Sequence, residues 1–92
     1  MTDHMTTDSV GQPVRIGTLV RVTDIHESIV APLSQPERDR VLSMLGETFK
    51  VYEVDEWGQA WVEKWWHGGE DLADSHSLGL EPQQMLVVQN GA

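Results

Sequence analysis

Two strand-like segments separated by a short turn constrain the fold of this chain more than any other feature. Apolar and polar side chains roughly alternate from Glu47 to Val54 and again from Gln59 to Trp66, which is typical of half-buried β-strands. Asp55-Glu56-Trp57-Gly58 lies between them and contains residues that favour turns. The sequence therefore predicts a β-hairpin at the centre of a mainly β fold.

Further strands are expected on both sides of this hairpin, over residues 15–23, 76–80 and 85–89. Residues 81–84 include Pro82 and predict a 3₁₀ turn that leads into the last strand. Five short strands with closely spaced turns indicate a small antiparallel barrel, because closing the sheet removes the exposed strand edges that invite aggregation.

One short helix is predicted after the first strand. Ser34 and Glu37 have the spacing of a capping box, in which both side chains accept backbone N–H groups at the helix start. Apolar residues then recur with helical spacing as far as Leu45, and Gly46 is a natural stop. We therefore expect a helix over residues 35–45.

The length of 92 residues is enough for one domain and too short for two. The polar composition of residues 1–13 predicts a disordered N-terminal arm. Residues 14–89 would then form the barrel domain, and residues 90–92 a frayed C-terminus.

The same segments resemble the SH3-like family of small β-barrels. The resemblance lies in Ile16–Val22 as the first strand, in Gly46–Glu63 as the central hairpin, and in Leu78–Val88 as the closing 3₁₀ turn and strand. It implies a mainly β fold, namely a small five-stranded SH3-like antiparallel barrel with one short helix after the first strand.

Two branches of that family imply different functions. In peptide-binding SH3 domains, Trp61 and Pro82 would correspond to the Trp and Pro of the binding groove, but Met85 stands where those domains carry a groove Tyr. The helix at 35–45 also takes the place of their long first loop. The chain is more similar to bacterial SH3-like accessory subunits, such as the peripheral photosystem I subunit and the barrel of the nitrile hydratase β-subunit. That resemblance implies docking without a catalytic centre, and it assigns no role to a particular residue.

The charge of the chain argues against nucleic acid and anionic membranes as partners. Fifteen acidic and six basic residues give a net charge of −9, and the basic residues do not form the cluster that phosphate binding requires. The sequence contains no membrane-length apolar stretch and no signal peptide. The absence of cysteine fits a reducing compartment. We therefore expect a cytoplasmic protein.

Four tryptophans within ten residues are the strongest binding signal. Strand alternation puts Ala60, Val62, Lys64 and Trp66 on one face and Trp61, Glu63 and Trp65 on the other. The first set suits a barrel interior, and the second set would then face outward. Exposed tryptophans are typical of interface hot spots, although other segments of the chain could instead cover these rings as a second small core. The candidate partner-binding residues are Trp57, Trp61, Glu63 and Trp65.

Possible metal ligands surround one loop, namely His67, Glu70, Asp71, Asp74 and His76. Their spacing matches no compact zinc motif, and Gly68-Gly69 favours a solvated loop, so we expect no metal and no cofactor. No strained nucleophile turn or phosphate-binding glycine loop occurs, and no enzyme activity is expected. The sequence predicts a non-catalytic module with a protein partner. The alternative is a small subunit that completes the active site of a larger enzyme complex.

Overall fold

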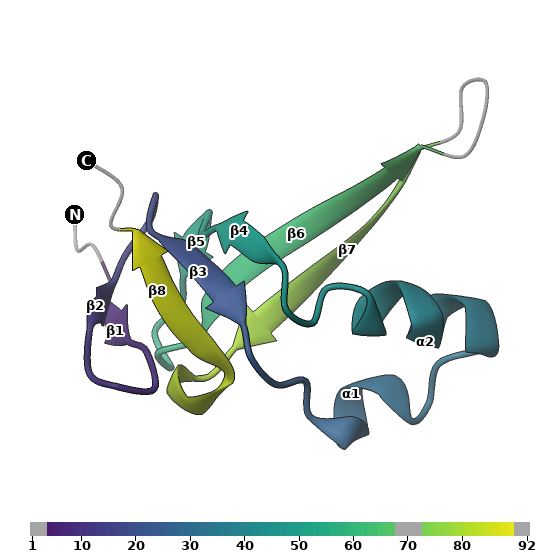
Figure 1. The fold of residues 1–92 in the computed structure, drawn as a ribbon, viewed down its shortest axis with the longest axis horizontal. Helices are drawn as coiled ribbons and strands as arrows, with labels where there is room; N and C mark the ends of the chain where they lie inside the picture. Colours follow the sequence, from purple (N-terminus) through teal and green to yellow (C-terminus); the bar gives the residue numbers. More distant parts are fainter. Residues whose placement is uncertain (1–3, 68–72, 90–92) are drawn as a thin grey trace.

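The computed structural model describes residues 4–67 and 73–89, and these form a mainly β molecule with three small antiparallel sheets (Figure 1). The first sheet pairs β1 (Thr6–Thr7) with β2 (Pro13–Val14). The second has the order β4-β3-β8 and consists of β3 (Leu19–Val22), β4 (Thr48–Lys50) and β8 (Met85–Gln89). The third has the order β5-β6-β7 and consists of β5 (Glu53–Val54), β6 (Ala60–His67) and β7 (Ala73–Leu80).

The predicted five-stranded SH3-like barrel is wrong. The described residues form eight strands in three sheets, none of which closes into a barrel, and two helices instead of one. The long ribbon of β6 and β7 runs past the β4-β3-β8 sheet (Figure 1). Among the described residues β7 pairs only with β6, so the ribbon does not continue around a closed cylinder.

The strand predicted over residues 47–54 changes sheets part-way along its length. Its first part is β4, which pairs with β3, and its second part is β5, which pairs with β6. The change occurs at Val51 and Tyr52. The Val51 N–H donates to the Thr18 carbonyl at 2.9 Å, whereas the Tyr52 N–H donates to the Trp61 carbonyl at 3.0 Å. One step of the backbone therefore connects the second sheet to the third.

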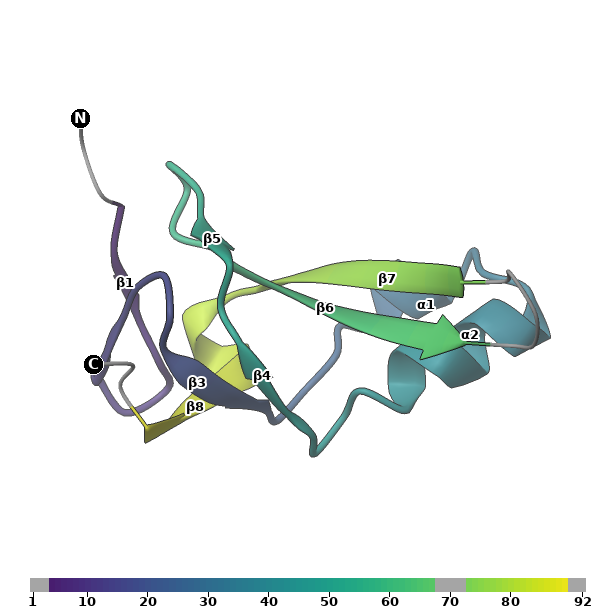
Figure 2. The same ribbon diagram turned by 90° about the horizontal axis from the view of Figure 1, so that it is seen from above.

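Two helices follow β3. They are α1 (Glu27–Val30) and α2 (Gln35–Leu42), and both lie beneath the far half of the β6–β7 ribbon (Figures 1 and 2). Arg38 joins them, because its guanidinium donates to the carbonyls of Val30 and Ala31, each at 3.3 Å. The helix predicted over residues 35–45 is thus present but ends earlier.

The capping box predicted at the start of α2 does not form. Ser34 occupies the N-cap position, but its side chain makes no capping hydrogen bond. A reciprocal box is found instead at the predicted 3₁₀ turn η1 (Pro82–Gln84), where Glu81 and Gln84 each accept the other's backbone N–H. The turn and the last strand are confirmed.

The structure places a small hairpin within the segment for which the sequence predicts a disordered arm. Asp8 lies between β1 and β2, is only 3% exposed, and ties this hairpin to β8. Its Oδ1 accepts the N–H groups of Val10 and Gln12, and its Oδ2 accepts the N–H of Val87 at 2.8 Å. Burial alone would raise the pKa of Asp8, but these N–H groups hold it below the ordinary 3.8.

The core lies between the second and third sheets and extends under the ribbon to α2. It comprises Val14, Val20, Val22, Ile25, Val30, Val41, Met44, Val51, Val54, Ala60, Val62, Leu78, Leu80 and Met85. Ile16 falls within the strand predicted over residues 15–23, but it lies before β3 and is 60% exposed. Gly17 has a φ of +96°, so the chain turns there and the strand begins only at Leu19.

Candidate functional site

The outward surface of the β5-β6-β7 sheet contains the predicted binding residues Trp61, Glu63 and Trp65, and we name it the tryptophan face. The burial of β6 follows the predicted alternation. Ala60 and Val62 are fully buried, whereas Glu63 and Trp65 are exposed and Trp61 is partly exposed. The same register brings Gly79, Ser77 and Ser75 of β7 opposite these three residues.

Trp61 is packed as well as exposed. A side-chain carbon added to Gly79, its cross-strand partner, would lie only 3.0 Å from Cζ2 of Trp61. The indole ring therefore covers Gly79, and this position has no room for a larger residue. The Trp61 indole N–H donates to Oδ2 of Asp55 at 3.0 Å. Neighbouring residues of its own sheet thus fix the ring in place.

Asp55 organises the turn between β5 and β6. Its Oδ1 accepts the backbone N–H groups of Trp57 at 3.0 Å and Gln59 at 2.9 Å. The Trp61 indole N–H and these backbone N–H groups stabilise the carboxylate and hold the pKa of Asp55 below the ordinary 3.8. Asp55 is therefore ionised at neutral pH.

Trp65 has a second carboxylate partner on the same face. Its indole N–H donates to Oε1 of Glu63 at 2.9 Å, and the Ser77 hydroxyl lies 3.5 Å from Oε2 of Glu63. The Trp65 side chain is still 54% exposed. The hydrogen bond orients the ring without covering it, so an aromatic surface remains available beside a negative charge.

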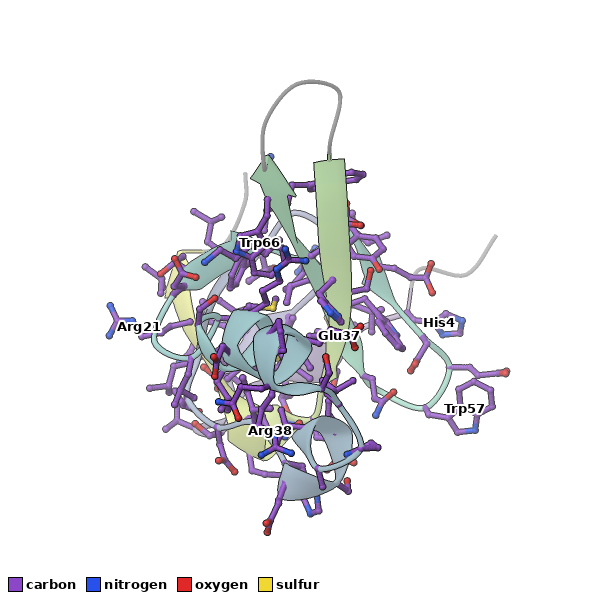
Figure 3. All side chains as sticks on the ribbon, turned by 90° about the vertical axis from the view of Figure 1, so that its right-hand side faces the viewer. His4, Arg21, Glu37, Arg38, Trp57 and Trp66 are labelled. Carbon is purple, nitrogen blue, oxygen red and sulfur yellow. The ribbon has the colours of Figure 1, made fainter. Side chains whose placement is uncertain are left out.

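Trp57 stands apart from the tryptophan face. It lies in the β5–β6 turn, is 79% exposed, and in Figure 3 lies far from Trp66. With Asp55, Glu56 and His4 it lines a shallow acidic hollow of about 370 Å³. Residues four apart in a strand are separated by about 13 Å, so Trp61 and Trp65 lie at separate points along β6 and the four tryptophans form no compact cluster.

Trp66 lies on the opposite surface of the ribbon, between β6 and α2 (Figure 3). It packs against the core, with Nζ of Lys64 5.3 Å and Cζ of Arg40 5.8 Å from the centre of its ring. The ring of His76 meets it edge-on at 6.1 Å. Lys64 also pairs with Glu47. Strand alternation brings Lys64 and Trp66 to the same face, but the sequence gives no signal for the contacts with Arg40, His76 and Glu47, which lie farther away along the chain.

Sequence reasoning also missed a groove beside β7. A hollow of about 370 Å³ lies between the end of β7 and the start of α1. It is lined by His26, Ser28, Ile29, Gln59, Gly79, Glu81 and Gln84. Only a folded structure brings these residues together, since α1 precedes β7 by some fifty positions.

No protein-family model, curated protein or solved structure matches this chain. The resemblance to SH3-like accessory subunits therefore stays a prediction. The closed barrel that it implies is not formed by the three sheets of the described residues. The functional interpretation rests on the geometry of the tryptophan face and of the groove.

The loop expected to be solvated lies largely outside the described residues, as do Glu70 and Asp71. Across residues 4–67 and 73–89, no group of three His, Cys, Asp or Glu side chains is placed to hold a metal ion. His76 contacts Trp66 instead. In the same part of the chain, no helix is long and apolar enough to cross a membrane.

Proposed function

We propose that this chain is a non-catalytic binding module that docks onto a partner protein through its tryptophan face. The observation that carries the proposal is Trp65, a half-exposed ring that a hydrogen bond from its indole N–H to Glu63 holds at the surface. Large aromatic side chains dominate the binding energy of many interfaces. Monomers seldom expose extended apolar surface without a function.

The orientation of these rings favours binding. Trp61 is fixed by Asp55 and by packing on Gly79, and Trp65 is oriented by Glu63. Ordering a side chain on association costs about 0.5–1.5 kcal/mol. Rings that are already oriented in the free protein avoid part of this cost. The tryptophan face therefore has the properties of a preformed docking surface.

The charge around these rings favours a basic partner. Glu53, Asp55, Glu56 and Glu63 all lie on β5, β6 or the turn between them, in a chain of net charge −9. Complementary charge accelerates encounter and excludes acidic partners. The proposal places this binding in the cytoplasm, because a chain without cysteine suits a reducing compartment.

Capture from cell lysate on the immobilised chain tests the proposal. We expect Trp65→Ala to weaken the specific partner by about tenfold or more, the effect of losing a hot-spot residue. Trp61→Phe should keep the ring over Gly79 but lose the bond to Asp55, and so weaken binding less. Val88→Ala is the matched control, since Val88 is an exposed apolar residue on a strand of the second sheet. If folded Trp65→Ala retains every partner that the wild type captures, the tryptophan face is not the docking surface.

A further inference from the structure

The outer side of β7 is an edge of the β5-β6-β7 sheet as far as the structure describes it. Within the described residues β7 pairs with β6 alone, over eight residues without a shift in register. Soluble proteins usually protect such edges with lysine, proline or a bulge, because an open edge is a template for another strand. β7 contains neither lysine nor proline. Its charged residue is Asp74, so the part of the edge around Ser77 and Gly79 contains no lysine, proline or charged residue.

The pairing of Trp61 determines which β7 backbone groups face outward. The Trp61 carbonyl accepts the Tyr52 N–H, so the backbone of Trp61 is directed toward β5 and away from β7. Gly79 lies opposite Trp61. In an antiparallel ladder, hydrogen-bonded and non-bonded pairs alternate. The N–H and C=O of Gly79, and those of Ser77 two residues earlier, consequently point away from β6.

The groove beside β7 leaves room for an added chain at this edge. Gly79 lies in its wall, Glu81 supplies a carboxylate, and Ile29 of α1 supplies a side chain that is 37% exposed. A strand paired with Ser77 and Gly79 would run along this groove. Its inward side chains would meet Ile29, and its outward side chains would lie on the tryptophan face.

Two residues of β7 on the tryptophan face, Ser77 and Gly79, are small, so a long side chain from an added strand could pass over β7. Ser77 and Gly79 separate the edge from Glu63 and Trp61. Neighbouring strands are about 4.8 Å apart, so a lysine or arginine on an added strand spans β7 and reaches β6. There it meets the Glu63 carboxylate and the exposed ring of Trp65, which attract a cation by ion pairing and by cation–π interaction.

We propose that the partner contributes an extended segment with lysine or arginine at alternate positions, which pairs with β7 as a fourth strand of the sheet. This inference rests on the proposed function, because the cationic side chains bind on the tryptophan face. It adds the partner's conformation, the backbone groups that hold it, and the charge of its side chains.

The probe is a capped ten-residue peptide in which lysine and valine alternate, titrated into the ¹⁵N-labelled chain. We expect shifts of the Ser77 and Gly79 amides and of the Trp65 indole N–H. A peptide with glutamate in place of lysine should bind at least about tenfold more weakly, because it meets like charge. Equal binding of the two peptides would overturn the inference.

Ser77→Pro tests the backbone contact. Proline removes the outward N–H of Ser77, but it leaves the β6–β7 ladder intact because that N–H does not bond to β6. We expect at least about tenfold weaker peptide binding, as for loss of an essential strand contact. Ser77→Ala is the matched control, since it removes the hydroxyl and keeps the N–H. A lysine peptide N-methylated on the residues that face β7 gives the same test without changing the protein.

The outcomes separate this inference from the proposed function. If Trp65→Ala weakens the lysine peptide while neither Ser77→Pro nor N-methylation does, the tryptophan face binds cations but β7 receives no strand, and the inference is wrong. If none of the three changes weakens binding, or the lysine peptide produces no shifts, the inference is wrong, whereas the proposed function fails only if folded Trp65→Ala retains every partner captured from lysate. A wild-type dimer that Ser77→Pro dissociates would show that a second copy occupies the edge, which also overturns the inference.

Discussion

Trp65 and Trp66 are adjacent in the sequence and lie in opposite environments. Trp65 points outward, is half-exposed, and donates its indole N–H to Glu63. Trp66 points toward α2, where the cationic groups of Lys64 and Arg40 lie near its ring and the core packs against it. Strand alternation alone separates them. One residue type therefore serves two roles in consecutive positions.

The neighbouring charges differ between Trp66, which packs against the core, and the tryptophans that we propose bind a partner. Carboxylates bond to the polar edges of Trp61 and Trp65 and leave the ring faces available. Cations lie near the ring of Trp66 and connect β6 with α2. The quadrupole of an aromatic ring attracts cations to the ring face. Lys64 and Arg40 lie near the ring of Trp66, whereas the exposed ring of Trp65 is left open.

The largest expected effect is on stability, from Trp66→Ala. This change removes a side chain that joins the ribbon to the helix, and we expect unfolding free energy to fall by about 3 kcal/mol, the low end of core Trp→Ala changes because Trp66 is only partly buried. Urea denaturation measures it. Trp65→Ala should cost less than about 1 kcal/mol, since surface changes are usually small. Equal decreases in unfolding free energy for the two variants would show that Trp66 contributes no more to stability than Trp65.

A smaller loss of unfolding free energy is expected when the charge of Lys64 is removed. Lys64→Met keeps an unbranched side chain but loses the ion pair with Glu47, the hydrogen bond to Ser43 and the contact with the Trp66 ring. The expected loss is about 1 kcal/mol, because the group is partly exposed and each contact is weakened by solvent. Lys50→Met on β4, at an exposed position, is the control in the same urea experiment. If Lys64→Met and Lys50→Met have the same unfolding free energy, the contacts of Lys64 do not contribute to stability.

Local pattern predicted those parts of the fold that depend on neighbouring residues. The alternation of β6, the turn after Asp55, and the 3₁₀ turn at Pro82 all follow from short stretches of sequence. The split at Val51 could not be predicted, because apolar periodicity specifies a strand but not its pairing partner. The barrel prediction failed for that reason. The same limit applies to the candidate site, where alternation gave the outward residues but not the groove beside Gly79.

The bond between Asp55 and Trp61 should have a pH dependence of defined sign. The indole N–H, with backbone N–H groups, lowers the pKa of Asp55 from 3.8. The ionised group therefore stabilises the folded state above the unfolded-state pKa, and that stabilisation is lost as pH falls through the lower folded-state value. Asp55→Asn should melt below the wild type at neutral pH, and the gap should narrow in acid below pH 3.8. A gap that stays constant over this range would show that the charge of Asp55 has no part in holding Trp61.

The smallest expected effect on the fold is from Glu63→Gln, and it tests the outer half of the comparison most directly. The amide oxygen can still accept the Trp65 indole N–H, and the side chain is exposed, so unfolding free energy should change by less than about 0.5 kcal/mol. Binding of the lysine peptide should weaken and become less sensitive to salt, because one carboxylate of the tryptophan face is lost while its ring stays in place. Titrations at low and high salt measure both effects. Unchanged salt dependence would mean that Glu63 only orients Trp65, and that the cation is recognised by the ring or by other carboxylates.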